Sequence, residues 1–309
     1  MSRTRMMYSA GIPMVGGGDP IPGRVPSTEF AAVFFVDPNR GSDGNPGDNK
    51  DQPLATWAKA HSLAPADGGA VIYGFPTKDA DEAITITKDN ITFINAARGP
   101  WRCTIKSTAG IPLTVQGYGF QAYGIQFHGI AAGKEAVRQQ ENGYRYMDCD
   151  FISDASHGMR LFPDNTVNGI AASEGQLYDC WFRDCGDVGL TFENPGSSAG
   201  GIGGTGPVGV KVDGGWFDNN TNQDILDVDA VSSNDNCFFR SLVQNCAFTT
   251  RNKAVYVRLN NGGANTGVIR RSSFAKDSAR LLNTEVLLAA GIVAVELYDA
   301  TGIVDTSGF

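Results

Sequence analysis

The chain has 309 residues, of which 41% are hydrophobic and 19% are charged, and 39 of them are Gly. This apolar content excludes a disordered protein, and many Gly with few charges favour strands and tight turns. The net charge of −8 argues against a nucleic-acid partner, because binding a phosphate backbone requires clustered Lys and Arg.

The first 29 residues differ in composition from the rest. Nine of the sixteen residues from Gly11 to Pro26 are Gly or Pro, which predicts no regular element there. The segment nevertheless carries apolar side chains, as an extended arm laid across another chain would. We therefore expect residues 1–29 to be an anchoring arm, with a flexible terminus as the alternative. The expected anchor residues are Met6, Met7, Tyr8, Ile12, Met14 and Val15.

Neither a secretory signal nor a membrane span is expected. The N-terminus has no apolar run of the length that a signal needs, and the apolar stretch 286–295 is too short to span a bilayer. We expect a chain made in the cytoplasm with no membrane partner.

Residues 30–76 read as a strand, a loop and a short helix that leads into a first strand-rich coil. Thr56 is a suitable N-cap, residues 57–64 can form two helical turns, and Pro65 ends them. Trp57, Ala60 and Leu63 would face the first coil, so we expect this helix to be a lid.

The loop before this helix is rich in aspartate. Asp37, Asp43 and Asp48 could bind Ca²⁺, but they lack EF-hand spacing. The alternative, which we favour, is that they bond to the backbone in tight turns.

A degenerate repeat follows. It aligns on Phe151, Phe182, Phe217, Phe248 and Phe274, with spacings of 31, 35, 31 and 26 residues. Two residues before each Phe stands a small residue, in the order Cys149, Cys180, Gly215, Cys246 and Ser272. Eight residues after each Phe stands an apolar residue, in the order Met159, Leu190, Ile225, Tyr256 and Leu282. Such a period indicates a solenoid.

The repeats are short, β-rich and split by Gly, Asn, Asp and Ser, which predicts an all-β parallel β-helix over residues 77–284. Phe would fill the interior, and the small column would lie where the interior narrows. Asp148, Asp179 and Asn245 would lie at a turn. Phe127 fits the spacing, but Glu135 interrupts the apolar column there. Residues 285–309 are expected to cap the solenoid or to contact other chains around a threefold axis.

The six Cys are expected to be free thiols, and the three His are isolated, so neither a metal site nor a cofactor is expected. Because three of the Cys lie in the small column, a nucleophilic role is disfavoured.

The stretch from Val33 to Pro76 resembles the opening of the pectate-lyase-like right-handed β-helix superfamily. Its "VDPNRGSDGNPG", "PLATWAKA" and "GGAVIYGFP" follow that pattern, with Gly68-Gly69 in place of the usual Gly-Asp. The resemblance implies a right-handed parallel β-helix with an N-terminal capping helix. It implies function poorly, because the superfamily includes lyases, hydrolases, phage tailspikes and inert virion proteins.

The motifs of the polygalacturonase-like members are absent: "SHGMR" at 156–160 lacks the first Gly of their "GHG", and "VIRRS" at 268–272 lacks the Lys of their "RIK". The best catalytic candidates are Asp224, Asp227 and Asp229, of which the last two share one face of a predicted strand. Lys253 and Arg258 could reach that face from the next coil. The alternative, which we favour, is a solvated strand face with Asp residues in turns, so no catalytic residue is favoured.

Trp181 and Trp216 each precede an inward Phe, so they should point outward. With Trp101 they could form a stripe on which sugars stack. Exposed aromatic residues also mark subunit interfaces, which is the interpretation we prefer.

Two functional hypotheses follow, beside a third, a host-encoded enzyme of the same superfamily, which an export signal would support. The first is a non-enzymatic bacteriophage virion protein, a homotrimer that decorates the capsid or forms a spike. Its partners would be the major capsid protein or other virion proteins, and it could bind a surface polysaccharide. The second is a tailspike-type depolymerase that cleaves a polysaccharide as a lyase or glycoside hydrolase.

Overall fold

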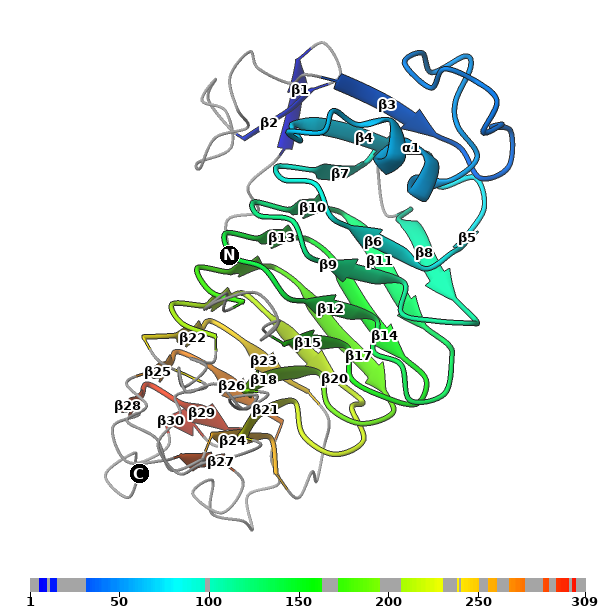
Figure 1. The fold of residues 1–309 in the computed structure, drawn as a ribbon. Coiled ribbons are helices and arrows are strands. Elements are labelled where there is room, and N and C mark those ends of the chain that lie inside the picture. The colour runs from blue at the N-terminus through cyan, green and yellow to red at the C-terminus, as the bar shows by residue number, and fades with distance from the viewer. Residues whose placement is uncertain are drawn as a thin grey trace, which may run out of the picture.

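The computed structural model describes residues 6–9, 12–15, 32–97, 101–162, 172–194, 207–229, 238, 240–249, 255–259, 267–275, 286–288, 293–299 and 302–303. Within these residues, no helix is long and apolar enough to cross a membrane. The chain winds into a solenoid with a helix at one end (Figure 1).

Three long sheets form the walls of the solenoid, and each complete coil from β4 to β27 contributes one strand to each sheet. Sheet 1 holds β3 (Ala32–Val36), β4 (Ala70–Gly74), β7 (Thr92–Asn95), β10 (Gln121–Tyr123), β13 (Arg145–Met147), β16 (Gln176–Tyr178), β19 (Lys211–Asp213), β22 (Leu242–Gln244), β25 (Val268–Arg270) and β28 (Val293–Val295). Sheet 2 holds β5 (Ala80–Asp81), β8 (Cys103–Ser107), β11 (Ile125–Gly129), β14 (Asp150–Ser153), β17 (Trp181–Cys185), β20 (Trp216–Asp218), β23 (Ala247–Phe248), β26 (Ser273–Phe274), β29 (Tyr298–Asp299) and β30 (Gly302–Ile303). Sheet 3 holds β6 (Ile84–Ile86), β9 (Leu113–Val115), β12 (Val137–Gln139), β15 (Met159–Leu161), β18 (Leu190–Asn194), β21 (Ile225–Asp229), β24 (Val257–Leu259) and β27 (Val286–Leu288).

Neighbouring strands within the sheets are parallel except for β29 and β30, so the predicted parallel β-helix is confirmed. Equivalent residues of successive coils form ladders along the axis. The predicted Phe ladder is confirmed, and Phe127 belongs to it although its downstream column is interrupted. Phe182 stacks between Phe151 and Phe217, with ring centroids 4.9 and 4.7 Å away.

The corner between sheets 1 and 2 is built on one backbone conformation. At this corner φ is positive in Gly124, Asp148, Asp179, Gly214, Asn245, Arg271 and Glu296. The turn predicted for Asp148, Asp179 and Asn245 is therefore confirmed, since this left-handed conformation suits Gly, Asn and Asp. The side chains of two of these residues bond to other coils: Asp148 pairs with Arg102, and Asn245 donates to Asp213.

The apolar column predicted eight residues after each Phe is correct in part. Met159, Leu190 and Ile225 are ladder partners on sheet 3. The next partner is Val257 and not Tyr256, because the connection from sheet 2 is one residue longer in that coil. Leu282 lies outside the described residues, and Val286 pairs with Val257. In the coil of Phe127 the position belongs to Val137, because that connection is two residues longer, and Glu135 lies before the strand.

The predicted lid is confirmed as α1 (Trp57–Leu63), which has Thr56 as its N-cap. The Trp57 ring lies 4.6 Å from the Phe93 ring, so the helix covers the end of the core. The expectation for Leu63 was wrong: its side chain is 41% exposed, and His61 is buried instead. In this orientation of the helix, His61 Nε2 accepts a hydrogen bond from Thr87 N–H at 3.3 Å.

The aspartate-rich loop is held by its own carboxylates. Asp37 accepts hydrogen bonds from the N–H groups of Asn39 and Arg40 at 3.0 and 3.1 Å. Asp43 accepts from the N–H groups of Ala55 and Thr56 at 3.0 Å. These bonds are the backbone role that we favoured over Ca²⁺ for these two residues.

Two terminal segments depart from the expectations. Met6–Ser9 (β1) and Ile12–Val15 (β2) form an antiparallel hairpin, so the prediction of no regular element from Gly11 onward was wrong. The side chains of the expected anchor residues lie outside the described residues. At the other end, β27, β28 and β29 continue the three sheets, so the coils extend beyond the expected boundary at residue 284.

Candidate functional site

The outer face of sheet 2 carries a continuous column of polar and aromatic side chains. Its strands alternate, so that Phe127 and Phe182 point into the core while the residues before them point outward. From the N-terminal end, the register aligns Thr104, Gln126, Asp150, Trp181, Trp216, Ala247 and Ser273. This column runs parallel to the solenoid axis.

A groove of about 770 Å³ lies over the first half of this column. It spans β8 to β17 and is also bordered by the turn after β4. The lining residues used below are Trp101, Arg102, Gln126, Asp150, Trp181 and Arg183. A cavity of this size falls within the range of small-molecule sites, which combine apolar walls with a few placed polar groups.

Two arginine–aspartate pairs fix the floor of the groove. Arg102 Nη2 lies 2.7 Å from Asp148 Oδ1, and Arg183 Nη2 lies 2.8 Å from Asp150 Oδ2. Burial raises the pKa of the Asp148 carboxyl above its usual value, although Arg102 acts in the opposite direction. Each carboxylate is therefore already paired with a guanidinium, and the Arg102 guanidinium lies near the Trp181 ring.

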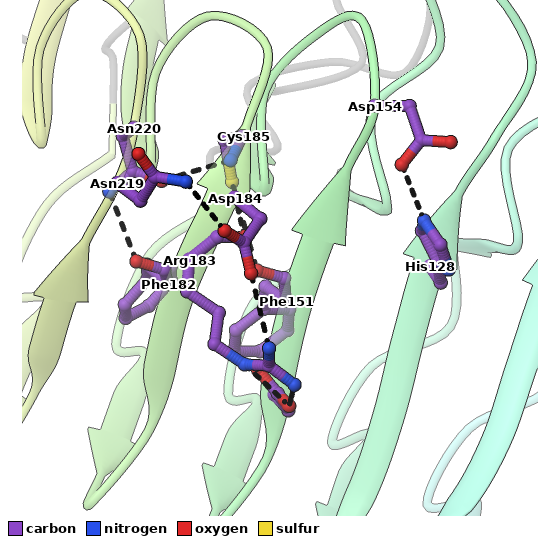
Figure 2. Close-up of polar contacts among 10 residues, drawn as sticks. His128, Phe151, Asp154, Phe182, Arg183, Asp184, Cys185, Asn219 and Asn220 are labelled. Atoms are coloured by element: carbon purple, nitrogen blue, oxygen red, sulfur yellow. Dashed lines mark hydrogen bonds and ion pairs between the residues drawn. The ribbon is translucent and has the colours of Figure 1, made fainter.

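Further polar pairs continue along the same face (Figure 2). His128 Nε2 on β11 lies 2.7 Å from Asp154 Oδ1, and Asn219 donates to Asp184 at 2.8 Å. Thr104 also donates to Gln126 at 3.1 Å. These bonds link adjacent coils and hold the polar side chains of the face in defined positions.

Trp181 and Trp216 are outward and exposed, as predicted, and Trp101 is exposed as well. The exposed fraction is 73% for Trp101, 41% for Trp181 and 42% for Trp216. The rings of Trp181 and Trp216 stack with centroids 5.6 Å apart, and the Arg102 guanidinium lies 6.0 Å from the Trp181 ring. Trp101 and Trp181 line the groove itself, whereas Trp216 follows beyond its end.

The aspartates that would be catalytic candidates in an enzyme lie elsewhere, on and before β21 of sheet 3. Asp224 and Asp227 are both buried, with 0% and 2% exposure. Asp227 shares the inward register of Ile225 and pairs with Phe192, whereas the exposed Arg258 pairs with the outward Leu226. The expected open strand face is therefore wrong for these two residues. The Asp229 side chain and Lys253 lie outside the described residues.

Sheet 3 instead carries a network of ion pairs on its outer side. Arg160 Nη2 donates to Glu193 Oε1 at 2.6 Å, and Arg138 pairs with Glu135. The guanidinium groups of both Arg lie over the Phe162 ring. Because each charge has a partner here, the arrangement is suited to holding adjacent coils together.

The described thiols are poor candidates for nucleophiles. Cys103, Cys149, Cys180, Cys185 and Cys246 are free and buried. Burial raises the pKa of Cys149 and of Cys246 to about 12, which disfavours the nucleophilic thiolate. Within the described residues, no three His, Cys, Asp or Glu side chains are placed to hold a metal ion.

Sequence reasoning identified the tryptophans of this face but missed its polar residues. The outward position of Asp150 could have been predicted, because Asp150 precedes an aligned Phe as Trp181 and Trp216 do. Arg102 had no such signal, since its partner Asp148 lies 46 residues away and the two meet only through coil stacking.

Comparison with solved structures identifies the architecture. Pectate lyase Pel9A is similar with a TM-score of 0.55 and 12% identity, covering 91% of this chain and 80% of its own. The pectin methylesterase from Aspergillus niger, in its deglycosylated form, is similar with a TM-score of 0.52 and 14% identity, covering 90% and 88%. The chain has a pectate-lyase-like parallel β-helix fold. Comparisons of the sequence with protein-family models and with curated proteins find no match.

Proposed function

We propose that this chain is a non-catalytic glycan-binding protein that holds a polysaccharide along the outer face of sheet 2. The observation that carries the proposal is the groove, where the exposed rings of Trp101 and Trp181 flank hydrogen-bonding groups such as Gln126. A sugar ring offers an apolar C–H face to an aromatic ring and hydroxyls to polar side chains, so this combination suits it.

The dimensions of the groove support an oligosaccharide over a single small molecule. From β8 to β17 the groove crosses three strand spacings, or about 14 Å, which accommodates a short run of sugar rings. The two similar structures are named as a pectate lyase and a pectin methylesterase. They support only the idea that this fold can present a surface to a polysaccharide.

The arrangement of carboxylates supports binding without cleavage. Acid–base hydrolysis uses two carboxyl groups within reach of the scissile bond. In the groove Asp148 and Asp150 are each paired with an Arg, and Asp224 and Asp227 are buried in another part of the solenoid. Glycan cleavage is the alternative activity.

The test is calorimetric titration of the full chain with soluble polysaccharides of two classes. Dextran, galactomannan and mixed-linkage β-glucan represent neutral glycans, and polygalacturonate and alginate represent uronates. Trp101→Ala should weaken the binding of a recognised glycan about tenfold, as truncation of an aromatic anchor does. Tyr118→Ala is the matched control, because Tyr118 is an exposed aromatic residue outside the groove.

Three results would count against this function. Absence of binding to every polysaccharide, or equal losses in the two variants, would contradict a glycan site at this groove. Release of new reducing ends or unsaturated products would show that the protein is an enzyme.

We also propose that the protein is a homotrimeric bacteriophage virion component attached through residues 1–29. Support comes from the β1–β2 hairpin, which forms its own two-stranded sheet and pairs with none of the described strands of the coils. Light scattering of the full chain tests the trimer, and a deletion of residues 1–29 should abolish incorporation into particles. A monomeric mass in light scattering, together with a monomer on the particle, would contradict the trimer.

A further inference from the structure

The column on sheet 2 is interrupted beyond the groove, where two small residues stand between Trp216 and Tyr298. Trp181 and Trp216 occupy consecutive positions, but the next two outward positions belong to Ala247 and Ser273. Ala247 is half-buried and Ser273 is exposed. Two large rings are thus followed by a step formed by two small side chains. Strand spacing makes this step about 10 Å wide along the axis.

Trp216 is the ring that borders this step. Trp181 stacks on the side of β17, and Arg102 approaches Trp181 from the direction of β8. The ring of Trp216 is oriented by its own hydrogen bond, because its Nε1–H donates to Thr249 Oγ1 at 3.0 Å. Thr249 in turn donates to Asp218 Oδ1 at 2.8 Å. The indole is therefore fixed before any ligand arrives, which reduces the entropy lost on binding.

The groups around the step define the chemistry of an occupant. The face of Trp216 toward β23 offers a flat apolar surface, and Asp218, Thr249 and Ser273 offer oxygen atoms that accept from or donate to hydroxyls. The Asp218 carboxylate would repel an anionic sugar. The adjoining groove carries three cations, Lys78, Arg102 and Arg183, and three carboxylates, Asp79, Asp148 and Asp150, so it provides no excess positive charge for a uronate.

We propose that Trp216, Asp218, Ala247, Thr249 and Ser273 form a subsite for one pyranose ring of a neutral glycan. The inference rests on the glycan-binding function proposed above and extends it beyond the groove. The sugar ring lies over Ala247, in the place that the next aromatic ring of the column would take. Its C–H face packs on Trp216, and its hydroxyls reach Asp218 and Ser273.

Filling the step tests this subsite without removing any contact of the protein. Ala247→Phe places a ring where the sugar is expected, and should weaken the binding of dextran, galactomannan or mixed-linkage β-glucan, whichever the wild-type chain binds, at least tenfold. Ala247→Ser, which leaves the step open, should remain within twofold. Trp216→Leu, which keeps an apolar but not a flat surface, should also lose at least tenfold. Thermal unfolding of each variant establishes that the coils are intact.

The outcomes separate the subsite from the function on which it rests. If Ala247→Phe and Trp216→Leu bind the neutral glycan as tightly as the wild-type chain while Trp101→Ala does not, the groove stands and the subsite is refuted. If the wild-type chain binds only polygalacturonate or alginate, the assignment to neutral sugars is wrong. If it binds no polysaccharide, the proposed function fails, and the subsite fails with it.

Discussion

Phe182 illustrates how single residues hold this solenoid together. Its ring is fully buried and stacks face to face with the equivalent rings of the coils before and after it. A parallel coil places the same residue type at the same position every turn, so one favourable contact is repeated along the axis. The packing of the interior therefore depends on the whole ladder of stacked rings more than on any single pair of rings.

Truncation of this ring should be costly. We expect Phe182→Ala to lower the free energy of unfolding by about 3–5 kcal/mol, because it removes buried surface and leaves a cavity between two rings. Guanidinium unfolding measures the loss, and Phe182→Leu, which keeps most of the volume, should lose less. Equal stability of the wild-type and Ala proteins would mean that the stack contributes nothing.

At the scale of elements, α1 depends on side chains from the first coil. Glu82 accepts hydrogen bonds from Trp57 N–H and Ala58 N–H at 3.0 Å, at the N-terminus of the helix. Lys88 Nζ donates to the carbonyls of His61 and Ser62 at the C-terminus, at 3.0 and 2.9 Å. The two residues flank β6, so this strand presents a carboxylate and an ammonium to the opposite ends of the helix dipole.

Removal of the ammonium should loosen the lid. We expect Lys88→Met to lower the free energy of unfolding by about 1–3 kcal/mol, because carbonyls at the helix end lose a charged donor. Amide exchange within α1 should accelerate. Lys106→Met is the matched control, since the Lys106–Asp79 pair is more exposed and should contribute at most about 1 kcal/mol. Equal effects of the two changes would argue against a specific role of Lys88.

The ion-pair network on sheet 3 predicts a larger effect. Arg160→Met leaves the buried Glu193 without its bidentate partner, and should lower the free energy of unfolding by about 3–5 kcal/mol. The double variant Arg160→Met/Glu193→Leu should recover much of this loss in chemical denaturation. If the double variant is as unstable as the sum of the single changes, the two residues do not form an energetic pair.

For the whole molecule, the buried His61 and the half-buried His157 predict a pH dependence. Burial lowers the pKa of His61 and of His157 from the usual 6.5. The unfolded chain therefore binds protons at a higher pH than the folded chain, so stability falls as the pH drops below about 6.5 and levels off below the folded pKa values. Denaturation midpoints between about pH 8 and pH 5 measure this effect. His61→Gln/His157→Gln should flatten the profile, and an unchanged slope would assign it to other groups.

The architecture could be predicted from the sequence because the repeated residues are of types that each have one strong structural preference. The Phe ladder and the small column of Cys149 and Cys180 are both interior positions, and their spacing fixed the coil. Strand positions that follow a connection were less predictable, because the length of the connection changes the residue that reaches a given ladder position. Val257, and not the expected Tyr256, is the ladder partner of Ile225 for this reason. The site was predictable only for Trp181 and Trp216, since Arg102 meets Asp148 through stacking of distant coils.

The connection between sheets 2 and 3 varies in length while the strands on both sides stay in register. Phe127 and Val137 are separated by ten positions, whereas Phe151 and Met159 are separated by eight, yet the two pairs are ladder neighbours. Gly133 in the longer connection has a positive φ of 68°, which favours Gly, and no heavy atom beyond the adjacent residues lies within 4 Å of the place where a Cβ would be. Foreign sequence inserted around this residue would project from the wall of the solenoid at a known height along its axis. We therefore expect that an epitope grafted into this connection is displayed at a defined coil, and that the ladders of the interior stay in register.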